Sequence, residues 1–428
     1  MSAGEEPARD RSFFFLVGAQ FFGAFNDNLY KQLLLLLAAK WMFPGEDQQG
    51  IAFAVFAAPF LLFSGFAGDL SERLSKRAVI VAMKFAEVAI MVLGAIALQC
   101  MNWMFLLAVL FLMGAQSAIF GPSKYGVIPE IVPERGLLRA NGTIAMTTFL
   151  SILLGQALAG PLLDAFGDLG ATRGPGRLWI TGATCAAFAV AGWTLSLGMR
   201  RLEPTRPDLR LPRQPFGNLF STMRAMARER HLLTAVLVNS VFWFDGGVLQ
   251  QAVNGLGGDS WLAIGPGENK LLSWLLVTLA GSVMAGCMLA PRVARAVRPS
   301  RMIACGCAAM AAAQALLILV GPVLSREQGG YALAHAALAL AGLSGAMFVV
   351  PVTTYLQAAP EPGSKGQAFA VNNFCNFSCI FLAGGFYQAG SMMALAPAVT
   401  AALAGLVLLA ALFLGRAFLH SCDERHRA

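Results

Sequence analysis

Residues 12–39 read SFFFLVGAQFFGAFNDNLYKQLLLLLAA, a stretch that is apolar except near its middle. A helix needs about 20 mostly apolar residues to cross a hydrocarbon core of about 30 Å. The stretch follows Arg9 and Arg11, as a secretory signal peptide would, but it is too long for the apolar region of a cleavable one. We therefore expect residues 12–39 to form a retained first transmembrane helix.

Blocks of similar length and composition continue along the chain. Of the 428 residues, 57% are hydrophobic and only 13% are charged, whereas soluble domains carry about 25% charged residues. Together with residues 12–39, these blocks predict an all-α integral membrane protein of twelve transmembrane helices. The other eleven helices are expected at residues 51–69, 78–99, 103–121, 138–160, 178–199, 232–254, 270–290, 301–320, 332–357, 366–388 and 395–418.

Lysine and arginine are distributed unevenly between the connecting loops. If both termini lie on one side, that side carries 24 of the 31 Lys and Arg residues and the other side carries five, while Lys31 and Lys84 lie inside helices. Cytoplasmic loops are enriched in these residues. We therefore expect both termini to be cytoplasmic. Basic loops that face anionic lipid explain the net charge of +8, so no nucleic-acid partner is needed.

The longest polar stretch, residues 200–231, divides the chain into two sets of six expected helices. It carries eight arginines and four prolines, a composition typical of a linker. We predict a six-helix half at residues 1–199, this basic cytoplasmic linker, and a second six-helix half at residues 232–428. The eight cysteines lie mostly inside apolar blocks, and no Cys or His spacing resembles a zinc site, so neither a metal nor another cofactor is expected.

Asp27 lies about halfway through the first expected helix, followed by Asn28. It comes fifteen residues after Ser12, roughly 22 Å along a helix that rises 1.5 Å per residue. A charge at that depth costs at least about 2.5–3.5 kcal/mol, so it should face the interior of the bundle. Asp27 and Asn28 are candidates for substrate binding. The alternative is a structural pair between Asp27 and Lys31, one turn further on.

Other polar residues lie within or at the ends of later helices. Lys124 follows Pro122, which should end the regular part of the fourth helix. Its ammonium could hold a phosphate at the cytoplasmic mouth, or it could simply face lipid headgroups. Lys84 and Glu87 are most simply an i,i+3 pair near the cytoplasmic end of the third helix. Four more candidates line a cavity or form hydrogen bonds between helices; they are Asp245 and Gln250 in the seventh helix and Asn373 and Asn376 in the eleventh.

The second and third expected helices are joined by residues 68–77, which read GDLSERLSKR. Acidic and basic residues in a tight cytoplasmic turn can bridge to neighbouring helix ends and exchange partners when those ends move. We therefore take Glu72, Arg73, Lys76 and Arg77 as candidate gating residues. The alternative is ordinary positive charge on a cytoplasmic loop.

Several motifs of enzymes are absent from the sequence. It contains neither a G-x-x-x-x-G-K-[ST] phosphate loop nor a G-x-S-x-G nucleophile elbow, and none of the four histidines begins an H-x4-D acyltransferase pattern. We expect no catalytic residues and no enzymatic activity.

Five short segments together resemble the lysophospholipid transporter (LplT-type) branch of the major facilitator superfamily. They are AQFFGAFNDN at residues 19–28, PSKYG at 122–126, RANG at 139–142, FVVPV at 348–352 and AVNN at 370–373. The loop at residues 68–77 also resembles the loop signature of that superfamily, with Glu72 and Ser75 in place of the usual Asp and Gly. The resemblance implies the major facilitator fold, with two six-helix halves and a substrate site between them near the midplane.

The resemblance also implies a function. Members of this branch move lysophosphatidylethanolamine and lysophosphatidylglycerol from the outer to the inner leaflet of the bacterial inner membrane. A cytoplasmic acyltransferase/acyl-carrier-protein synthetase then restores the missing acyl chain, and is the expected partner. Asp27, Asn28 and Lys124 match family motifs and are the functional residues that the resemblance implies.

Two departures from the family pattern leave alternatives open. Gln250 stands where the family has an Arg, and Asn376 where it has a Glu, which is consistent with the loss of a partnered charge pair. One alternative is a proton-coupled carrier of a drug or small metabolite, coupled through Asp27 or Asp245. Another is a membrane scaffold that recruits the acyltransferase through residues 200–231, although a scaffold has no need of buried acids.

Overall fold

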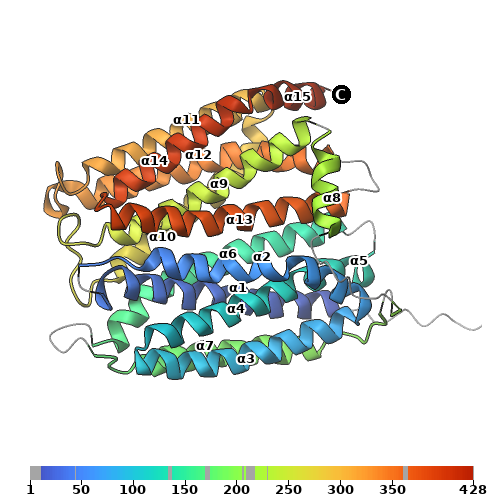
Figure 1. Ribbon diagram of the computed structural model, residues 1–428, viewed down its shortest axis with the longest axis horizontal. Coiled ribbons are helices and arrows are strands. Elements are labelled where there is room, and N and C mark those ends of the chain that lie inside the picture. The colour runs from blue at the N-terminus through green and yellow to red at the C-terminus, as the bar shows by residue number, and fades with distance from the viewer. Residues whose placement is uncertain are drawn as a thin grey trace, which may run out of the picture.

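The computed structural model describes residues 11–43, 45–133, 137–168, 174–204, 207–208, 217–228, 230–359 and 365–427. Within these residues, twelve helices have 18 residues or more, and all lie roughly along one axis (Figure 1). They are α1 (Ser12–Leu36), α2 (Gln49–Arg73), α3 (Lys76–Cys100), α4 (Trp103–Gly126), α6 (Leu137–Phe166), α7 (Leu178–Leu197), α9 (Arg230–Gly255), α10 (Lys270–Val293), α11 (Pro299–Leu316), α12 (Tyr331–Ala358), α13 (Lys365–Met392) and α14 (Pro397–Leu414).

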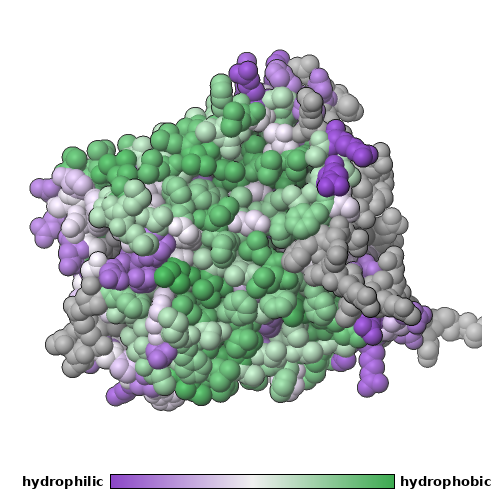
Figure 2. Space-filling view, in the orientation of Figure 1, coloured by the Kyte–Doolittle hydropathy of each residue, from purple (hydrophilic) through white to green (hydrophobic). Residues whose placement is uncertain are grey.

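The prediction of an all-α membrane protein is confirmed. In the described part of the chain, ten helices are long and apolar enough to cross a membrane. The two other long helices, α1 and α13, are of similar length but carry the polar residues around Asp27 and Asn373. Figure 2 shows a broad hydrophobic surface across the middle of the molecule and hydrophilic residues gathered toward its two ends, as a bilayer requires.

The long helices pack in two sets. In the first set, α1 packs on α6 and α7, α3 packs on α7 and α4, and α2 packs on α4. In the second set, α10 and α11 pack on α12, and α9 packs on α13 and α14. We call α1–α7 the first group and α9–α14 the second group; they occupy the lower and upper parts of Figure 1. The groups meet mainly where α2 packs on α13 and α6 packs on α10.

The contact between α2 and α13 depends on two glycines. A Cβ atom built on Gly50 would lie 2.5 Å from the carbonyl oxygen of Gly384, and one built on Gly384 would lie 2.6 Å from that of Gly50. Any side chain at either position would force the backbones apart. Small residues allow this close approach between transmembrane helices, where dispersion contacts dominate association.

The two ends of the bundle are named here after one lysine each. The Lys40 end contains the last residues of α1 and the first of α2, together with the turn between α9 and α10. The Lys76 end contains the turn between α2 and α3 and the short helices α5 (Ile128–Ile131), α8 (Gly217–Met226) and α15 (Arg416–Arg427), which lie at the right of Figure 1. The sequence analysis predicts that the Lys76 end faces the cytoplasm.

The structure corrects three details of the sequence analysis. Pro122 does not end the fourth helix, because α4 continues to Gly126. Proline removes one N–H donor, and here the helix absorbs that loss and completes another turn. The expected linker contains α8, and the last expected helix is followed by a separate helix, α15. Helix α15 is amphipathic, and its Phe418 and Cys422 are buried, so it packs on the bundle through its apolar face. It was not predicted because it is too short to cross a membrane.

Candidate functional site

Asp27 is held by one of its two carboxylate oxygens. The hydroxyl of Ser117 on α4 donates a hydrogen bond of 2.5 Å to Asp27 Oδ2. The second oxygen, Oδ1, is buried and has no hydrogen-bond partner. A buried polar atom without a partner is costly and therefore points to a functional use. The expectation that Asp27 faces the interior of the bundle agrees with this position.

The structural pair between Lys31 and Asp27, which was the alternative to a substrate-binding role, is not formed as a close ion pair. Among the described residues, no carboxylate lies within 4 Å of the Lys31 ammonium, which instead lies 5.1 Å from the ring centre of Phe56 and 5.5 Å from that of Phe53, both on α2. Only 8% of the residue is exposed. Asp27 contacts α4 and Lys31 contacts α2, so the i,i+4 spacing does not give a close ion pair, although the two charges still act on each other. The ring faces attract the ammonium but supply no negative charge.

Lys84 and Glu87 form the predicted pair on α3, with 2.6 Å between Lys84 Nζ and Glu87 Oε2 and only 1% of each side chain exposed. Asn26 of α1 donates a hydrogen bond of 3.0 Å to the other oxygen of Glu87. This asparagine also donates to the backbone oxygen of Cys185 on α7, so it joins three helices. Asn26 was not predicted as a site residue, because nothing in the sequence marks it except its position beside Asp27.

Lys124 and Asn28 lie near α6. The ammonium of Lys124 donates to Gln20 Oε1 of α1 at 3.1 Å and lies 4.6 Å from the ring centre of Tyr125. Gln20 in turn donates to the Thr148 hydroxyl of α6 at 2.9 Å. The amide of Asn28 donates back to its own helix, to the carbonyl of Ala24. Among the described residues, no carboxylate lies within 4 Å of the Lys124 ammonium. The side chain of Asn28 is bonded within α1.

The basic residues of the loop between α2 and α3 bridge to neighbouring elements, as predicted. Lys76 Nζ lies 2.5 Å from Glu130 of α5, and Arg77 donates to the carbonyl oxygens of Met199 and Leu197 beyond α7. Arg73 is exposed at the end of α2. The structure thus brings this loop onto the ends of helices of the first group; an exchange of partners by these residues and by Glu72 stays a prediction.

Asp245 does not lie beside Asp27. It accepts a hydrogen bond of 2.7 Å from the amide of Gln314 on α11, and only 1% of the residue is exposed. The contacts of Gln314 extend to Gly405 of α14. Asp245 therefore points into the second group, between α9, α11 and α14, and away from the first group. This placement favours interhelical hydrogen bonding, the alternative that the sequence left open.

Asn376 and Asn373 point in different directions on α13. The Oδ1 atom of Asn376 accepts hydrogen bonds from Asn239 at 3.1 Å and from Ser240 at 2.9 Å, both on α9. Asn373 is exposed, and its side chain makes no hydrogen bond to another described residue. Ser240 is ten residues from Gln250 on α9, roughly 15 Å along the axis. The interpretation of Gln250 and Asn376 as a former charge pair is therefore wrong for this chain, because the two positions are too far apart.

Gln250 joins the second group to the first through a chain of amides. Its Nε2 donates to Gln32 of α1 at 3.1 Å; Gln32 donates to Asn254 at 2.8 Å, and Asn254 donates to Gln49 of α2 at 3.1 Å. All four residues are at least nine-tenths buried. We call them the amide relay. Sequence analysis could not find Gln32 or Gln49, because their role depends on which helices meet at this point.

The relay ends at Asp47, in the turn before α2. Asp47 Oδ2 accepts hydrogen bonds from the Gln49 amide at 2.8 Å and from the Tyr387 hydroxyl of α13 at 2.9 Å. The backbone oxygen of Asp47 also accepts from Gln388 and Ser391. Burial raises the pKa of the Asp47 carboxyl to about 6, although these hydrogen bonds act in the opposite direction. Among the described residues, no basic side chain forms an ion pair with it.

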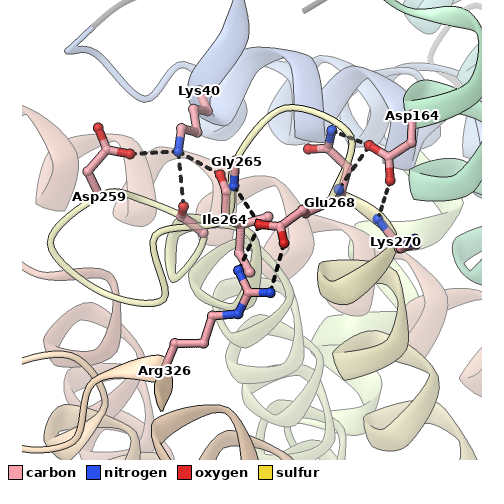
Figure 3. Close-up of polar contacts among 10 residues, drawn as sticks. Lys40, Asp164, Asp259, Ile264, Gly265, Glu268, Lys270 and Arg326 are labelled. Atoms are coloured by element: carbon pink, nitrogen blue, oxygen red, sulfur yellow. Dashed lines mark hydrogen bonds and ion pairs between the residues drawn. The ribbon is translucent and has the colours of Figure 1, made fainter. Parts of the chain in front are cut away.

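Further polar contacts surround the relay at the Lys40 end (Figure 3). Lys40 donates to Asp259 at 2.7 Å and to the carbonyl oxygen of Ile264 at 2.8 Å. This contact lowers the pKa of Asp259. Glu268 and Arg326 face each other with two hydrogen bonds of 2.7 and 2.8 Å, which lower the pKa of Glu268 to about 2. Both carboxylates therefore stay charged at neutral pH.

Asp164, at the end of α6, holds the start of α10. Its carboxylate accepts hydrogen bonds from the backbone and side-chain amides of Asn269, at 2.9 and 2.7 Å, and from the backbone amide of Lys270 at 2.9 Å (Figure 3). A carboxylate at a helix N-terminus satisfies free N–H groups and favours the helix dipole. Asp164 thus fastens the first group to the second.

These contacts give the bundle a clear asymmetry. Between described residues, every hydrogen bond and ion pair that links the first group to the second lies at the Lys40 end. At the Lys76 end, described residues of the two groups are not linked in this way. Within the described part of the chain, the two groups are therefore linked by polar contacts at the Lys40 end. Among the described residues, no cluster of His, Cys, Asp and Glu is arranged to hold a metal ion.

Comparison with known proteins gives consistent similarities. The family model described as Major Facilitator Superfamily matches residues 16–384. The chain is 26% identical over 385 residues to the protein named lysophospholipid transporter LplT of Yersinia pestis (strain Pestoides F), covering 89% of this chain and 87% of that protein. The LplT protein of Yersinia pseudotuberculosis serotype O:3 (strain YPIII) matches to the same extent. These matches confirm the resemblance inferred from the sequence motifs.

Solved structures with the same fold include transporters of other substrates. A POT family transporter in complex with 5-aminolevulinic acid superposes with a TM-score of 0.73 at 11% identity, covering 96% of this chain and 97% of that one. A bacterial homologue of the human lysosomal transporter Spinster superposes with a TM-score of 0.65 at 13% identity, covering 98% of each chain. At these identities the comparison establishes the fold.

Proposed function

Because the chain belongs to the Major Facilitator Superfamily, we propose that it is a transporter whose substrate is lysophospholipid. The similarity to lysophospholipid transporters over most of the chain supports this substrate class. The observation that carries the proposal is the free, buried oxygen of Asp27, a negative group placed inside the membrane without a partner. Such a group suits the ammonium of an ethanolamine headgroup.

The proposed direction is from the outer to the inner leaflet of a bacterial inner membrane, for lysophosphatidylethanolamine and lysophosphatidylglycerol. The Lys40 end would face outward and the Lys76 end the cytoplasm, where an acyltransferase/acyl-carrier-protein synthetase would restore the missing chain. Lys124, which has no acidic partner within 4 Å, would hold the phosphate as the headgroup leaves. The acyl chain would follow the apolar helix faces.

The proposed movement is a rocking of residues 1–199 against residues 232–428, with residues 200–231 as the linker. The hydrogen bonds at the Lys40 end would have to break each time the site opens outward. Lys76 and Arg77 would exchange partners at the other end. The asymmetry of the contacts supports this proposal, because a bundle fastened at both ends could not release a substrate.

The experiment is transfer of labelled lysophosphatidylethanolamine from the outer to the inner leaflet in spheroplasts that carry this protein, with and without a protonophore. Transfer well above the empty-vector control that survives the protonophore supports lysolipid transport driven by downstream acylation. Transfer equal to the empty-vector control, at confirmed expression, contradicts the proposal.

A second candidate is a proton-coupled carrier of a drug or small metabolite. The observation that favours it is the presence of two acids inside the bundle, Asp27 and Asp245, in helices of different groups. This candidate predicts that the protein neither binds nor moves lysolipid and that uptake of its substrate collapses with the protonophore. The two arms of the experiment therefore separate the candidates.

A further inference from the structure

Lys31 is the least explained charge within the bundle. Among the described residues, its ammonium makes no hydrogen bond and has no carboxylate within 4 Å, although the charge of Asp27 acts on it from farther away. The residue is more than nine-tenths buried between α1 and α2. A buried ammonium without an acid is strongly disfavoured unless something else compensates it. The rings of Phe53 and Phe56 offset only part of that cost, because a ring face carries no net charge. The missing partner is an anion.

Asp27, one turn earlier on the same helix, lacks a hydrogen-bond donor, whereas Lys31 lacks an anion. Asp27 Oδ1 is buried and has no donor, while Ser117 is already committed to Asp27 Oδ2. The residue as a whole is only partly buried, but this oxygen is covered, so a ligand reaches it only when the helices around it move apart. The missing partner of this oxygen is a hydrogen-bond donor, and a cation suits it best.

The two deficiencies have the spacing of one small zwitterion. Residues four apart on a helix are separated by roughly 6 Å along its axis. In a phosphoethanolamine group, an ester oxygen and two carbons separate the phosphorus from the ammonium, so its two charged ends can face two side chains that begin one helical turn apart. Lys124 is less suited to complete the pair, because it comes seven residues after Ser117 on α4, roughly 10 Å along that axis, and it already donates to Gln20.

We propose that Lys31 and Asp27 are the two poles of one receptor for a phosphate diester that carries an ammonium group, with Lys31 binding the phosphate and Asp27 Oδ1 the ammonium. This inference rests on the proposed lysolipid transport and names Lys31 as the residue that selects for phosphate. Lys124 is then a later contact on the way to the Lys76 end. A lipid headgroup and a free phosphoethanolamine compound share this chemistry.

The test is equilibrium binding to the purified full chain in lipid nanodiscs. The ligands are lysophosphatidylethanolamine, lysophosphatidylglycerol, monoacylglycerol, which lacks phosphate, and glycerophosphoethanolamine, which lacks the acyl chain. The variants are Lys31→Met, Lys31→Arg and Asp27→Asn, with Lys270→Met as control, since Lys270 is an exposed lysine at the Lys40 end. A thermal melt of each variant shows that it is folded.

Lys31→Met should raise the Kd of both phospholipids about tenfold or more, as expected for the loss of one charge-assisted contact, and leave monoacylglycerol binding unchanged. Lys31→Arg should recover most of the affinity. Asp27→Asn should weaken lysophosphatidylethanolamine but not lysophosphatidylglycerol, which has no ammonium. Lys270→Met should bind all ligands like the wild type.

Three results would overturn the inference. The first is wild-type affinity for both phospholipids in Lys31→Met; the second is an equal loss of all ligands, monoacylglycerol included, in a folded variant. If the wild type binds no lysolipid but binds glycerophosphoethanolamine through Lys31, the lipid substrate is wrong and the receptor is right. The third overturning result is a wild type that binds neither lysolipid nor glycerophosphoethanolamine. In that case the proposed function and the receptor both fail.

Discussion

Gln250 of α9 donates a hydrogen bond of 3.1 Å to Gln32 of α1, and this bond links the two groups of helices within the bundle. Both side chains are buried, with 9% and 0% of the residue exposed. Buried amides need all their partners, because an unpaired amide inside a low-dielectric medium is costly. The amide relay is therefore stable only while the Lys40 end stays closed, or when water enters the opened end to replace it.

The first prediction concerns Gln32→Leu. The variant removes two hydrogen bonds between the groups and leaves Gln250 and Asn254 without their partner, so the closed Lys40 end should lose about 1–3 kcal/mol of stability. Hydrogen–deuterium exchange in residues 45–49 should become several-fold faster in the purified protein. The segment is chosen because it contains Asp47 and Gln49.

Gln99→Leu is the matched control for Gln32→Leu. Gln99 also lies at the Lys40 end, but its amide donates to Gly176 within the first group. Exchange in residues 45–49 should stay as in the wild type. Equal acceleration in both variants would mean that loosened packing, and not the link between groups, governs this segment.

The second prediction concerns pH. The pKa of Asp47 is raised to about 6 in the closed structure from an ordinary value of 3.8, because the carboxyl is buried. The closed Lys40 end therefore binds the proton more tightly than an opened, hydrated end would. The contribution of this proton to closure is fully present below about pH 4 and is lost as the pH rises through about 6. Asp259 and Glu268 have lowered pKa values and stay ionised through most of that window.

Exchange in residues 45–49 checks this prediction between pH 4.5 and 7.5, after correction for the intrinsic exchange rate. Protection should fall as the pH rises through about 6. Asp47→Asn imitates the protonated side chain, so its protection should change little over the same range. If Asp47→Asn keeps the pH dependence of the wild type, a group other than Asp47 is responsible for it.

The third prediction concerns the buried pair of α3. Glu87→Gln leaves the Lys84 ammonium buried without a negative partner, and breaking such a pair costs about 3–5 kcal/mol. The melting temperature of the purified protein should fall by several degrees. The double variant Lys84→Met with Glu87→Leu removes both charges and should recover most of the loss. If the double variant is as unstable as the single one, packing and not charge determines stability at this site.

The helices could be predicted from the sequence because a bilayer imposes one length on every span. The expected first helix at residues 12–39 and third helix at residues 78–99 differ from α1 and α3 by no more than a few residues. The Lys84–Glu87 pair was predicted because both residues lie on one helix, and local spacing decides their contact.

The candidate site was only partly predictable, because its contacts join different helices. Lys31 could turn to Asp27 or to another helix, and only the position of Phe53 and Phe56 decides between them. The relay partner of Gln250, Gln32, lies 218 residues away in the chain. Single-sequence periodicity carries no information on such pairings.

The last prediction separates the two buried acids. Each acid keeps one oxygen without a partner, but Asp27 is only partly buried and lies in the first group, whereas Asp245 is 1% exposed and faces Gln314 inside the second group. In the lysolipid transfer assay, Asp27→Asn should reduce lysophosphatidylethanolamine transfer at least about tenfold, the size expected when one charge-assisted contact is lost. Asp245→Asn should stay within about twofold of the wild type, because an amide can still bond to Gln314 and no substrate contact is removed. Expression of both variants is measured in the same membranes. Loss of transfer in Asp245→Asn at normal expression would contradict this prediction and bring Asp245 back as a functional group.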